Sequence, residues 1–214
     1  MPVLNETAGI VAALEALAPL RAAGHQVIVA DGGSEDGTVE LARPLCDRVV
    51  IAPRGRASQM NAGAQEARGD ALLFLHADTR CPPDVARAIE QAMKSHLWGR
   101  FDVEIEGTHP LLKVISWSMN LRSRLTGIAT GDQAIFVRRD AFAGFPAIAL
   151  MEDVAFSRAM KRRGAAPACL RSRVRTSGRR WESRGVLRTV LLMWRLRLAY
   201  ALGADPAHLA EKYR

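Results

Sequence analysis

The sequence predicts an α/β protein in which helices cover a mostly parallel central sheet. Apolar runs of strand length alternate with helix-like patterns through the first half, and this order is typical of parallel strands joined by helical crossovers. The 214 residues, 49% hydrophobic and 24% charged, match one ordinary globular domain. A chain of this length buries enough apolar surface to fold without a metal or a disulfide as support.

The predicted elements of the first half alternate in type along the chain. We expect helices over residues 8–23, 37–45, 57–67 and 83–95. We expect strands over residues 27–30, 48–52 and 71–75. Ligands of such sheets bind beyond the carboxyl ends of the strands, so the residues after Ala30 and after Leu75 are the first candidates for chemistry.

The second half of the chain is less regular. Residues 101–106 alternate apolar and acidic side chains, as an edge strand does, and residues 134–137 predict another strand. Helices are expected over residues 111–125, 154–163 and 186–202. We predict a catalytic domain over residues 1–171 and a basic helical extension of the same domain over residues 172–214.

Positive charge is concentrated at the end of the chain. The formal net charge is +8, but residues 1–153 carry −4 and residues 154–214 carry +12. Arginine supplies 26 of the 30 cations, which favours bidentate contacts with phosphate or carboxylate. Aromatic residues make up only 6%, and the tail lacks the interleaved aromatic side chains of single-strand binders, so no nucleic-acid partner is expected.

The cysteines and the apolar segments indicate where the protein works. Cys46, Cys81 and Cys169 are an odd number without a C-x-x-C pair, which fits a reducing compartment and argues against a zinc site. Residues 1–6 lack the features of a signal peptide. Residues 186–202 form the longest apolar stretch, but three arginines interrupt it, so it is not expected to span a bilayer. The expected location is the cytoplasm.

Two acidic motifs directly follow predicted strands. Asp31 precedes Gly32 and Gly33, where a carboxylate can accept a hydrogen bond from a base or a ribose; the structural alternative is an Asx turn leading into the next helix. Asp78 can hold a hard divalent ion against a diphosphate, and its alternative role is a helix N-cap. His76 suits Mn²⁺ better than Mg²⁺, or it donates a hydrogen bond to phosphate.

Two further motifs lie in the second half. Glu152 and Asp153 precede a predicted helix, where a carboxylate can act as a general base or can simply favour the helix dipole. Arg179, Arg180 and Trp181 offer guanidinium groups for a pyrophosphate and an indole for stacking on a sugar or base. The alternative is a solvated basic loop anchored by the tryptophan.

The order of these motifs resembles the family 2 glycosyltransferases of the GT-A fold. The resemblance begins at residues 2–6 (PVLNE), which usually close that family's first strand, and runs nearly to the end of the chain. The bacterial radical-SAM/selenodomain-associated subgroup is most similar, through residues 75–79, 131–139, 151–153 and 179–182. Relatives usually have several apolar residues before the segment that corresponds to residues 2–6. We therefore expect either a short first strand or a start codon further upstream.

The resemblance implies an inverting transferase that moves a sugar from a nucleotide-diphosphate donor, UDP-linked by preference, to a hydroxyl acceptor. Asn5, Glu6 and Asp31 would line the nucleotide pocket, with Asp31 reading the uracil or the ribose. Asp78 matches the last residue of the family's Asp-x-Asp motif and would hold Mn²⁺ or Mg²⁺ against the diphosphate. His76 replaces the first carboxylate of that motif and is a second candidate ligand.

The resemblance also assigns roles on the acceptor side. Asp153 matches the catalytic base, which removes the proton of the acceptor hydroxyl. Arg180 and Trp181 fall where relatives carry a Gln-x-x-Arg-Trp element that contacts diphosphate and acceptor. The residues assigned to the acceptor loop are Gly131, Asp132, Gln133 and Glu152.

Lipid-linked acceptors are common among these relatives, which directs attention to two predicted helices. Residues 111–125 and 186–202 each combine a tryptophan with arginine and large aliphatic side chains, as helices at a membrane surface do. They predict peripheral contact with the inner face of the membrane. Burial in a homodimer or against the catalytic domain is the alternative, because Arg188 and Arg197 do not share one polar face.

Two other classes of function stay open at the level of sequence. A nucleotidyltransferase would share the strand-end carboxylate and the basic pocket, but it usually carries a Gly-rich signature with a lysine near the amino terminus. A non-catalytic basic module for RNA or anionic membrane is suggested by the +12 tail. Binding that depends on UDP or Mn²⁺ distinguishes the transferase from such a module.

Overall fold

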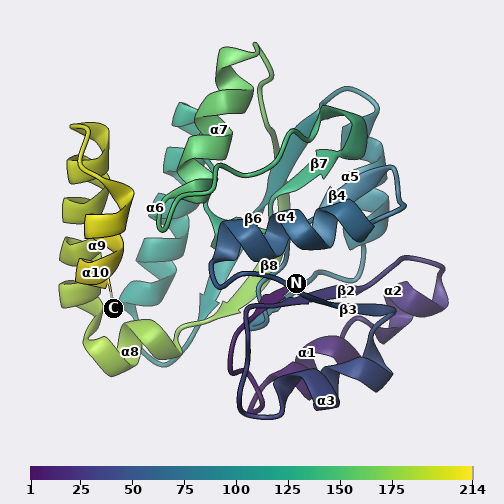
Figure 1. Ribbon diagram of the computed structural model, residues 1–214. Helices are drawn as coiled ribbons and strands as arrows, with labels where there is room; N and C mark the ends of the chain where they lie inside the picture. Colours follow the sequence, from purple (N-terminus) through teal and green to yellow (C-terminus); the bar gives the residue numbers. More distant parts are fainter. Residues whose placement is uncertain (214) are drawn as a thin grey trace.

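The structure, a computed structural model, describes residues 1–213, which form two β-sheets with helices packed around them (Figure 1). The first sheet contains β1 (Pro2–Val3), β2 (Ile28–Asp31) and β3 (Arg48–Ile51), which lie in that order and run parallel. Val3 pairs with Asp31, so the short first strand ends beside the first acidic motif.

The second sheet is mixed. Its strands are β4 (Ala71–Leu73), β5 (Thr79–Arg80), β6 (Trp98–Glu106), β7 (Phe136–Arg138) and β8 (Ala168–Ser177). They lie in the order β4-β7-β6-β8-β5, where β6 and β8 are parallel and the other neighbours are antiparallel. The α/β class is confirmed, but the expected parallel arrangement holds only for the first sheet. Apolar runs do not reveal strand direction, which depends on the path of the chain between them.

Ten α-helices lie within residues 1–213. They are α1 (Ile10–Glu15), α2 (Ala18–Ala22), α3 (Thr38–Ala42), α4 (Arg56–Glu66), α5 (Val85–Met93), α6 (Leu111–Thr126), α7 (Glu152–Arg162), α8 (Arg179–Arg184), α9 (Val186–Ala201) and α10 (Pro206–Tyr213). Helices α1 and α3 cover one face of the first sheet and α4 packs on the other (Figure 1). None of the helices in these residues is both long and apolar enough to cross a membrane.

The predicted helix over residues 8–23 is wrong as one continuous element. It is divided into α1 and α2 at Leu17, with Pro19 in the first turn of α2. Proline has no N–H group and its ring collides with the preceding turn, so a helix restarts there instead of passing through it. The predicted helix over residues 37–45 likewise changes to a 3₁₀ turn over Arg43–Leu45, which contains Pro44.

Strand β8 is absent from the predicted elements. Its alternate residues are exposed arginines, at positions 171, 173 and 175. Such a polar sequence is typical of a solvent-exposed loop. Val174 between these arginines is fully buried, and the strand pairs with β6 over most of its length. The boundary drawn between residues 171 and 172 therefore falls inside a strand of the sheet.

Residues 101–106 of β6 pair with β8 along one edge, while side chains of α6 bond the other edge. The Val103 N–H donates to Asn120 Oδ1, the Asn120 side-chain amide donates to the Val103 carbonyl, and the Ile105 N–H donates to Ser116 Oγ, all at 2.9 Å. The expected edge strand is wrong for β6 as a whole, which lies between β7 and β8 at the centre of its sheet; residues 101–106 lack a strand on one side because β7 pairs only with Trp98 and Gly99. Helix α6 closes an edge that would otherwise be open to another strand.

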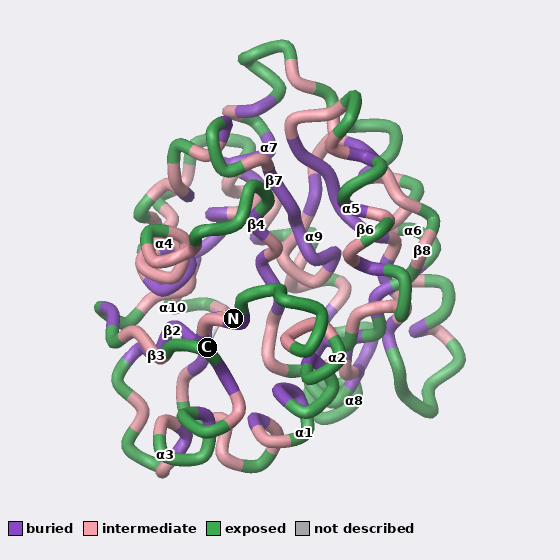
Figure 2. Tube along the Cα trace, turned by 90° about the vertical axis from the view of Figure 1, so that its right-hand side faces the viewer, coloured by how far each residue is buried: buried purple, intermediate pink, exposed green. Residues whose placement is uncertain are grey.

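Buried residues concentrate along the strands at the centre of the molecule (Figure 2). The largest apolar cluster joins the first sheet to the second sheet, and Phe101 and Phe136 meet inside it. A second cluster surrounds Trp98 and Phe156, whose rings meet edge to face at 5.5 Å. A third joins α7 to α9 and α10. These contacts bring the ends of β2 and β4 and the start of α7 into one rigid framework.

Candidate active site

Asp31 ends β2 and orders the loop that follows it. Its buried carboxylate accepts hydrogen bonds from the N–H groups of Gly33 at 2.8 Å and Ser34 at 2.9 Å, and from the Ser34 hydroxyl. The Asx turn considered as an alternative for this motif is therefore present. It fixes the shape of the loop, and a contact between Asp31 and a nucleotide stays a prediction.

A glutamine of α4 forms hydrogen bonds with the backbone next to this loop. Gln59 is buried, and its side-chain amide donates to the carbonyls of Val3 at 2.6 Å and Ala30 at 3.0 Å. A Cβ atom at Gly32 would lie 2.9 Å from the Gln59 side chain, so only glycine allows the backbone to pass so close. The ends of β1 and β2 are thus tied to the same helix.

Asn5 and Glu6 follow β1 and face the loop after β2. The Asn5 N–H donates to Ser34 Oγ at 2.8 Å, and Asn5 Oδ1 accepts from the Glu35 N–H at 3.0 Å. Burial raises the pKa of Glu6, and the nearby charge of Asp78 raises it further. Glu6 and Asp78 therefore face the same region, as expected for residues assigned to one donor pocket.

Asp78 lies in the turn between β4 and β5 with an exposed side chain. Its Oδ1 accepts from the Thr79 hydroxyl at 3.2 Å, and its carbonyl accepts from the Ser177 N–H of β8 at 3.1 Å. The N-cap of α5 is Asp84, so the N-cap alternative for Asp78 is wrong. The Asp78 carboxylate is left open to solvent and to ligands.

His76 packs against the turn that carries Gly131 and Asp132. Its Nδ1 lies 3.5 Å from Asp132 Oδ1, and a Cβ atom at Gly131 would lie 2.8 Å from its Nε2. Burial acts to raise the pKa of Asp132, but the His76 hydrogen bond and charge, together with Arg56 and Arg180, hold it below its usual range. His76 therefore contributes to the shape of this turn, and a contact between His76 and a metal ion stays a prediction.

The donor atoms fit a divalent ion only in part. No group of three or more His, Cys, Asp or Glu side chains within residues 1–213 is placed to hold a metal. The exposed carboxylate of Asp78 suits a hard cation, and diphosphate oxygens of a donor would have to supply other ligands. His76 already faces Asp132, so it is the weaker of the two predicted ligands.

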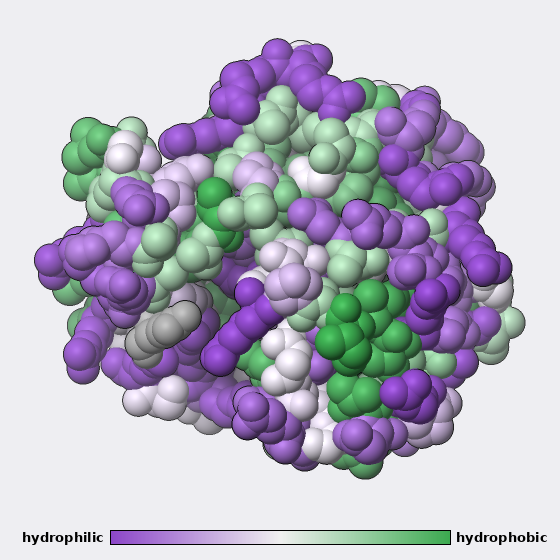
Figure 3. Space-filling model, viewed as in Figure 1, coloured by the Kyte–Doolittle hydropathy of each residue, from purple (hydrophilic) through white to green (hydrophobic). Residues whose placement is uncertain are grey.

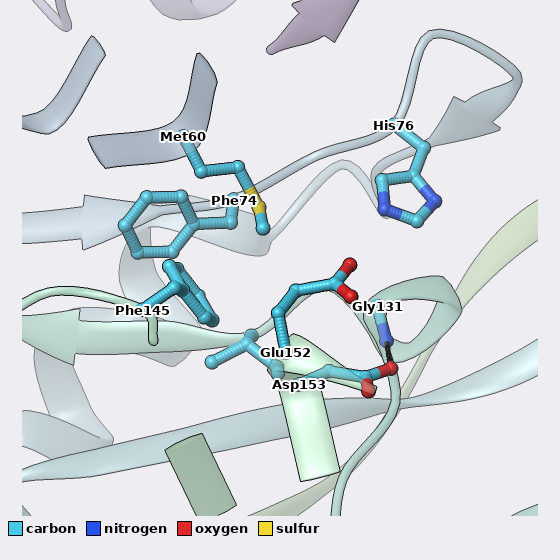
Figure 4. Close-up of a pocket in the computed structure, with 8 residues that line it drawn as sticks. Met60, Phe74, His76, Gly131, Phe145, Glu152 and Asp153 are labelled. Atoms are coloured by element: carbon cyan, nitrogen blue, oxygen red, sulfur yellow. Dashed lines mark hydrogen bonds between the residues drawn. The ribbon is translucent and has the colours of Figure 1, made fainter. Parts of the chain in front are cut away.

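Glu152 and Asp153 are the first two residues of α7, which begins two residues earlier than predicted. Their charges lie where the helix dipole favours them. Asp153 Oδ2 accepts from the Gly131 N–H at 2.8 Å, and Oδ1 accepts from the Val154 N–H at 2.7 Å. In the close-up, Asp153 points toward Gly131 and Glu152 points toward His76 (Figure 4). The two neighbouring carboxylates therefore have different surroundings.

Glu152 is 3% exposed and forms an ion pair with Arg56, whose Nε lies 2.8 Å from Glu152 Oε1. Burial raises the pKa of Glu152, and the charge of Arg56 opposes that rise. The sequence analysis does not name Arg56. Its position offered a signal, because Arg56 opens α4 just after β3, in the same relation to its strand as the acidic motifs.

Two side chains near the site, Arg122 and Tyr213, are not among the residues that the sequence analysis names, and Tyr213 contacts the predicted Arg180. Arg122 of α6 has Nε and Nη2 buried without a partner among residues 1–213; burial lowers its pKa, and Asp153 opposes this. The guanidinium of Arg180 lies 4.3 Å from the ring centroid of Tyr213 and hydrogen-bonds its hydroxyl. Tyr213 comes from α10, so the last described helix closes one side of the site.

Trp181 and Gln133 contribute mainly through packing and hydrogen bonds inside the protein. Trp181 lies in α8, so this segment is a helix and not a loop, but Trp181 anchors it on the largest apolar cluster while Arg179 and Arg180 are exposed, as the alternative expects. Gln133 is fully buried, and its side chain accepts from the Thr130 N–H and donates to Asn120. Gln133 therefore holds the Gly131–Asp132 turn in place instead of facing an acceptor.

Comparisons with known proteins show the family of this chain. The model of the family described as Glycosyl transferase family 2 matches residues 1–152. The chain belongs to glycosyl transferase family 2. A relative in this chemistry, the undecaprenyl-phosphate 4-deoxy-4-formamido-L-arabinose transferase of Aeromonas hydrophila, is 28% identical over 158 residues, which cover 64% of this chain and 46% of the relative. The chain thus spans about half the length of that protein.

Solved structures show the same fold as this family 2 member. Mannosyl-3-phosphoglycerate synthase from Rubrobacter xylanophilus has a TM-score of 0.59 at 19% identity, covering 95% of this chain and 74% of that one. Glucosyl-3-phosphoglycerate synthase from Mycobacterium tuberculosis, solved with Mn²⁺, UDP and glucosyl-3-phosphoglycerate, has a TM-score of 0.58 at 17% identity, covering 80% and 68%. These likenesses confirm the GT-A fold.

Proposed function

We propose that this family 2 glycosyltransferase transfers a sugar from a nucleotide-diphosphate donor, UDP-linked by preference, to a hydroxyl acceptor with inversion at the anomeric carbon. The observation that carries the proposal is the carboxylate of Asp153, which two backbone N–H groups fix beside a pocket also lined by His76 and Glu152. A structural relative was solved with Mn²⁺ and UDP-glucose, which supports the choice of donor class.

Asp153 is the proposed catalytic base. It takes the proton of the acceptor hydroxyl, whose oxygen bonds to the anomeric carbon while the bond from that carbon to the diphosphate oxygen breaks. The nucleoside diphosphate leaves with the electron pair. A carboxylate assists such a step when it lies within about 3 Å of the hydroxyl, and the bonds from Gly131 and Val154 fix its orientation for that contact.

Basic side chains near the site are proposed to stabilise the leaving diphosphate. Arg180 lies close enough to Asp132 to lower its pKa, so its positive charge reaches the site from α8. A charge that develops on the leaving group is stabilised by fixed cations in a site with little water. A Mn²⁺ or Mg²⁺ ion held by Asp78 and the diphosphate would supply further neutralisation.

The nucleotide is proposed to lie across the ends of β1 and β2. Asn5, Glu6 and Asp31 line this pocket, and the hydrogen bonds of Asn5 with Ser34 and Glu35 support the assignment because they join the two loops into one surface. Assignment to the radical-SAM/selenodomain-associated subgroup is a proposal that rests on the four sequence motifs described above.

The acceptor is proposed to be lipid-linked and to be modified at the cytoplasmic face of a membrane. The Aeromonas relative carries undecaprenyl phosphate in its name, which supports a lipid acceptor for this chain. We also propose that residues 1–171 form the catalytic part and residues 172–214 a basic extension of the same domain, which is helical after the strand residues 172–177 that complete β8. A homodimer is the alternative arrangement for the extension.

The test is a panel of nucleotide sugars scored for thermal stabilisation and for Mn²⁺-dependent turnover. Asp78→Ala is expected to lose metal-dependent donor binding. Asp153→Asn is expected to keep donor binding and to lose turnover by roughly 10²- to 10⁴-fold, the usual contribution of a general base. Wild-type turnover in both variants would contradict the assigned roles. Incorporation of a nucleotide into product, in place of a sugar, would favour the nucleotidyltransferase alternative.

A further inference from the structure

Exposed large apolar side chains are concentrated on α6 and α9. Nine of the eleven such side chains in residues 1–213 lie on these helices or at the C-cap of α9: Val114, Trp117, Leu121, Leu125, Leu187, Leu191, Trp194, Leu198 and Leu202. Trp117 is 64% exposed and Trp194 is 70% exposed. Isolated exposed apolar residues are normal, but contiguous groups of this size mark a binding surface.

The spacing of these residues places them on one stripe of each helix. On α9 the stripe runs from Leu187 to Leu202 in steps of three and four residues, and on α6 it runs from Val114 to Leu125 in the same way. Side chains at such steps share one helix face. The opposite face of α9 is already used, because Leu196 is buried in the third apolar cluster. The stripe is therefore a second apolar face that no described residue covers.

Helix α9 lies at one end of the molecule, and α6 lies next to it (Figure 1). Their starts meet, since Pro110 and Val186 line the same hollow. Beyond the end of α6, Ile128 packs against the cluster that contains Leu196 of α9. In the space-filling view, apolar side chains project at the left edge, where α9 ends (Figure 3). The two stripes therefore lie on neighbouring helices, and each is open to a partner.

The charges that flank the stripes select the partner. Neither α6 nor α9 contains an acidic residue. At 100° per residue, Arg188 and Arg195 lie on one side of the α9 stripe and Arg197 on the other, while Lys113 flanks the α6 stripe. No carboxylate of residues 1–213 forms an ion pair with these four cations. A second copy of this face would bring like charges together, whereas anionic lipid headgroups would neutralise them.

We propose that this α6–α9 surface, made of the nine apolar side chains and these four cations, docks on an anionic lipid bilayer. The apolar stripes enter the boundary of headgroups and acyl chains, and the cations extend along them to reach phosphate. Tryptophan suits this depth because its ring is apolar and its N–H group is polar. Arg197 lies on the opposite side of the α9 stripe from Arg188 and Arg195, so these arginines do not share one polar face. A helix that lies flat in the headgroup region places cations on both sides of its apolar stripe in this way.

Docking at this surface would bring the candidate site to the membrane. The Gly131–Asp132 turn follows the end of α6 by a few residues, and α8, which carries Arg180, leads directly into α9. A lipid-linked acceptor would then meet Asp153 close to the bilayer. The surface itself does not depend on the proposed reaction, because lipid binding is measured without a donor or an acceptor.

Vesicle flotation with the full chain tests the proposal. We expect the protein to float with vesicles of phosphatidylglycerol and phosphatidylcholine, not with phosphatidylcholine alone, and to be released in part by high salt. Brominated lipids should quench tryptophan emission, and the quenching should fall in Trp117→Phe and Trp194→Phe. Protein that stays in solution with anionic vesicles would overturn the proposal.

Matched variants identify the surface. Trp194→Ser combined with Leu198→Ser should weaken vesicle binding by at least about tenfold, since two large apolar groups leave the interface. Ile51→Ser, at a side chain of similar exposure on β3, should bind like wild type. Equal weakening by both changes would overturn the assignment. A wild-type dimer in sedimentation that the double variant breaks, without flotation, would instead show a second copy as the occupant.

The charge contribution has its own control. Arg188→Gln combined with Arg195→Gln should lower the affinity for anionic vesicles by roughly tenfold, because each cation near a charged surface contributes separately. Arg87→Gln on α5 removes an exposed arginine elsewhere and should have no effect. Retained turnover in a variant that no longer floats would leave the proposed function intact, while flotation by an inactive Asp153→Asn variant would leave the surface intact.

Discussion

The two acidic loops of the site are held in contrasting ways. The Asp31 carboxylate accepts hydrogen bonds from Gly33 and Ser34, two and three residues away, so the turn at Asp31 is held within one short segment. Asp153 depends on Gly131 in another segment, and its neighbour Glu152 depends on Arg56 from α4. The Asp31 turn is therefore local, although Asn5 joins it to β1 and Gln59 joins β1 and β2 to α4. The acceptor side exists only when α4, the turn after α6 and α7 are packed together.

This difference predicts how each side responds to substitution. A change in the turn at Asp31 leaves the bonds of Gln59 to Val3 and Ala30 in place and should affect the rest of the protein little. A change on the acceptor side removes a contact between elements that nothing else replaces, so geometry, turnover and stability should change together. Four substitutions, ordered by expected effect, test the contrast.

Gly131→Ala should have the largest effect. The added Cβ would lie 2.7 Å from His76 Cε1, so the turn has to shift and carry with it the N–H group that fixes Asp153. We expect turnover to fall by about 10²-fold, which a displacement of roughly 1 Å can cause, with donor binding largely kept. Steady-state kinetics measure it. Gly9→Ala, where a Cβ meets no atom within 4 Å, is the control and should react like wild type.

Arg56→Met should have the second largest effect, and we expect it to lower the stability of the fold. It leaves the buried carboxylate of Glu152 without its partner. Arg56 is itself 38% exposed, so we expect a loss of about 2 kcal/mol in the free energy of unfolding, less than for a fully buried pair. Chemical denaturation measures the loss. Adding Glu152→Gln should recover part of it because the charge that needs a partner is gone; no recovery would show that packing, not charge, makes Arg56 important.

Gly33→Ala tests the donor side. The backbone at Gly33 has a φ of +88°, while a Cβ there would meet no atom within 4 Å. The cost is therefore one of backbone conformation, about 1 kcal/mol in the free energy of unfolding. Thermal or chemical denaturation measures it. A loss larger than that of Arg56→Met would break the contrast between the two sides.

Asp36→Ala should have the smallest effect, and its effect depends on pH. Hydrogen bonds that Thr38 and, to a smaller extent, Thr7 donate to the Asp36 carboxylate lower its pKa from 3.8 to about 2. The stabilisation is complete above the unfolded-state pKa and is lost as pH falls toward 2. The variant should be less stable than wild type near neutral pH, and the gap should close on acidification. A gap independent of pH would show that the carboxylate charge is not involved. Asp36→Asn should retain part of the bonding without the pH dependence.

Sequence patterns found the local features of this protein and missed the contacts between distant segments. The strand ends at Asp31 and Asp78 are visible because an apolar run followed by an acidic turn is a short pattern. Strand β8 was not predicted because its exposed arginines make the segment strongly polar, although Val174 within it is buried. Arg56, Arg122 and Tyr213 are also hidden, since each reaches the site from a helix whose pattern describes its own packing.

By itself the sequence determined the α/β class, the acidic groups at the strand ends, the division of charge along the chain and the resemblance to its family. All of these depend on neighbouring residues, whose side chains share a face or a turn wherever the chain goes. Tertiary structure alone decided the mixed second sheet, the partner of each carboxylate and the placement of two apolar stripes on neighbouring helices. Each of these depends on which elements pack together, and packing is set by the whole core rather than by any one segment.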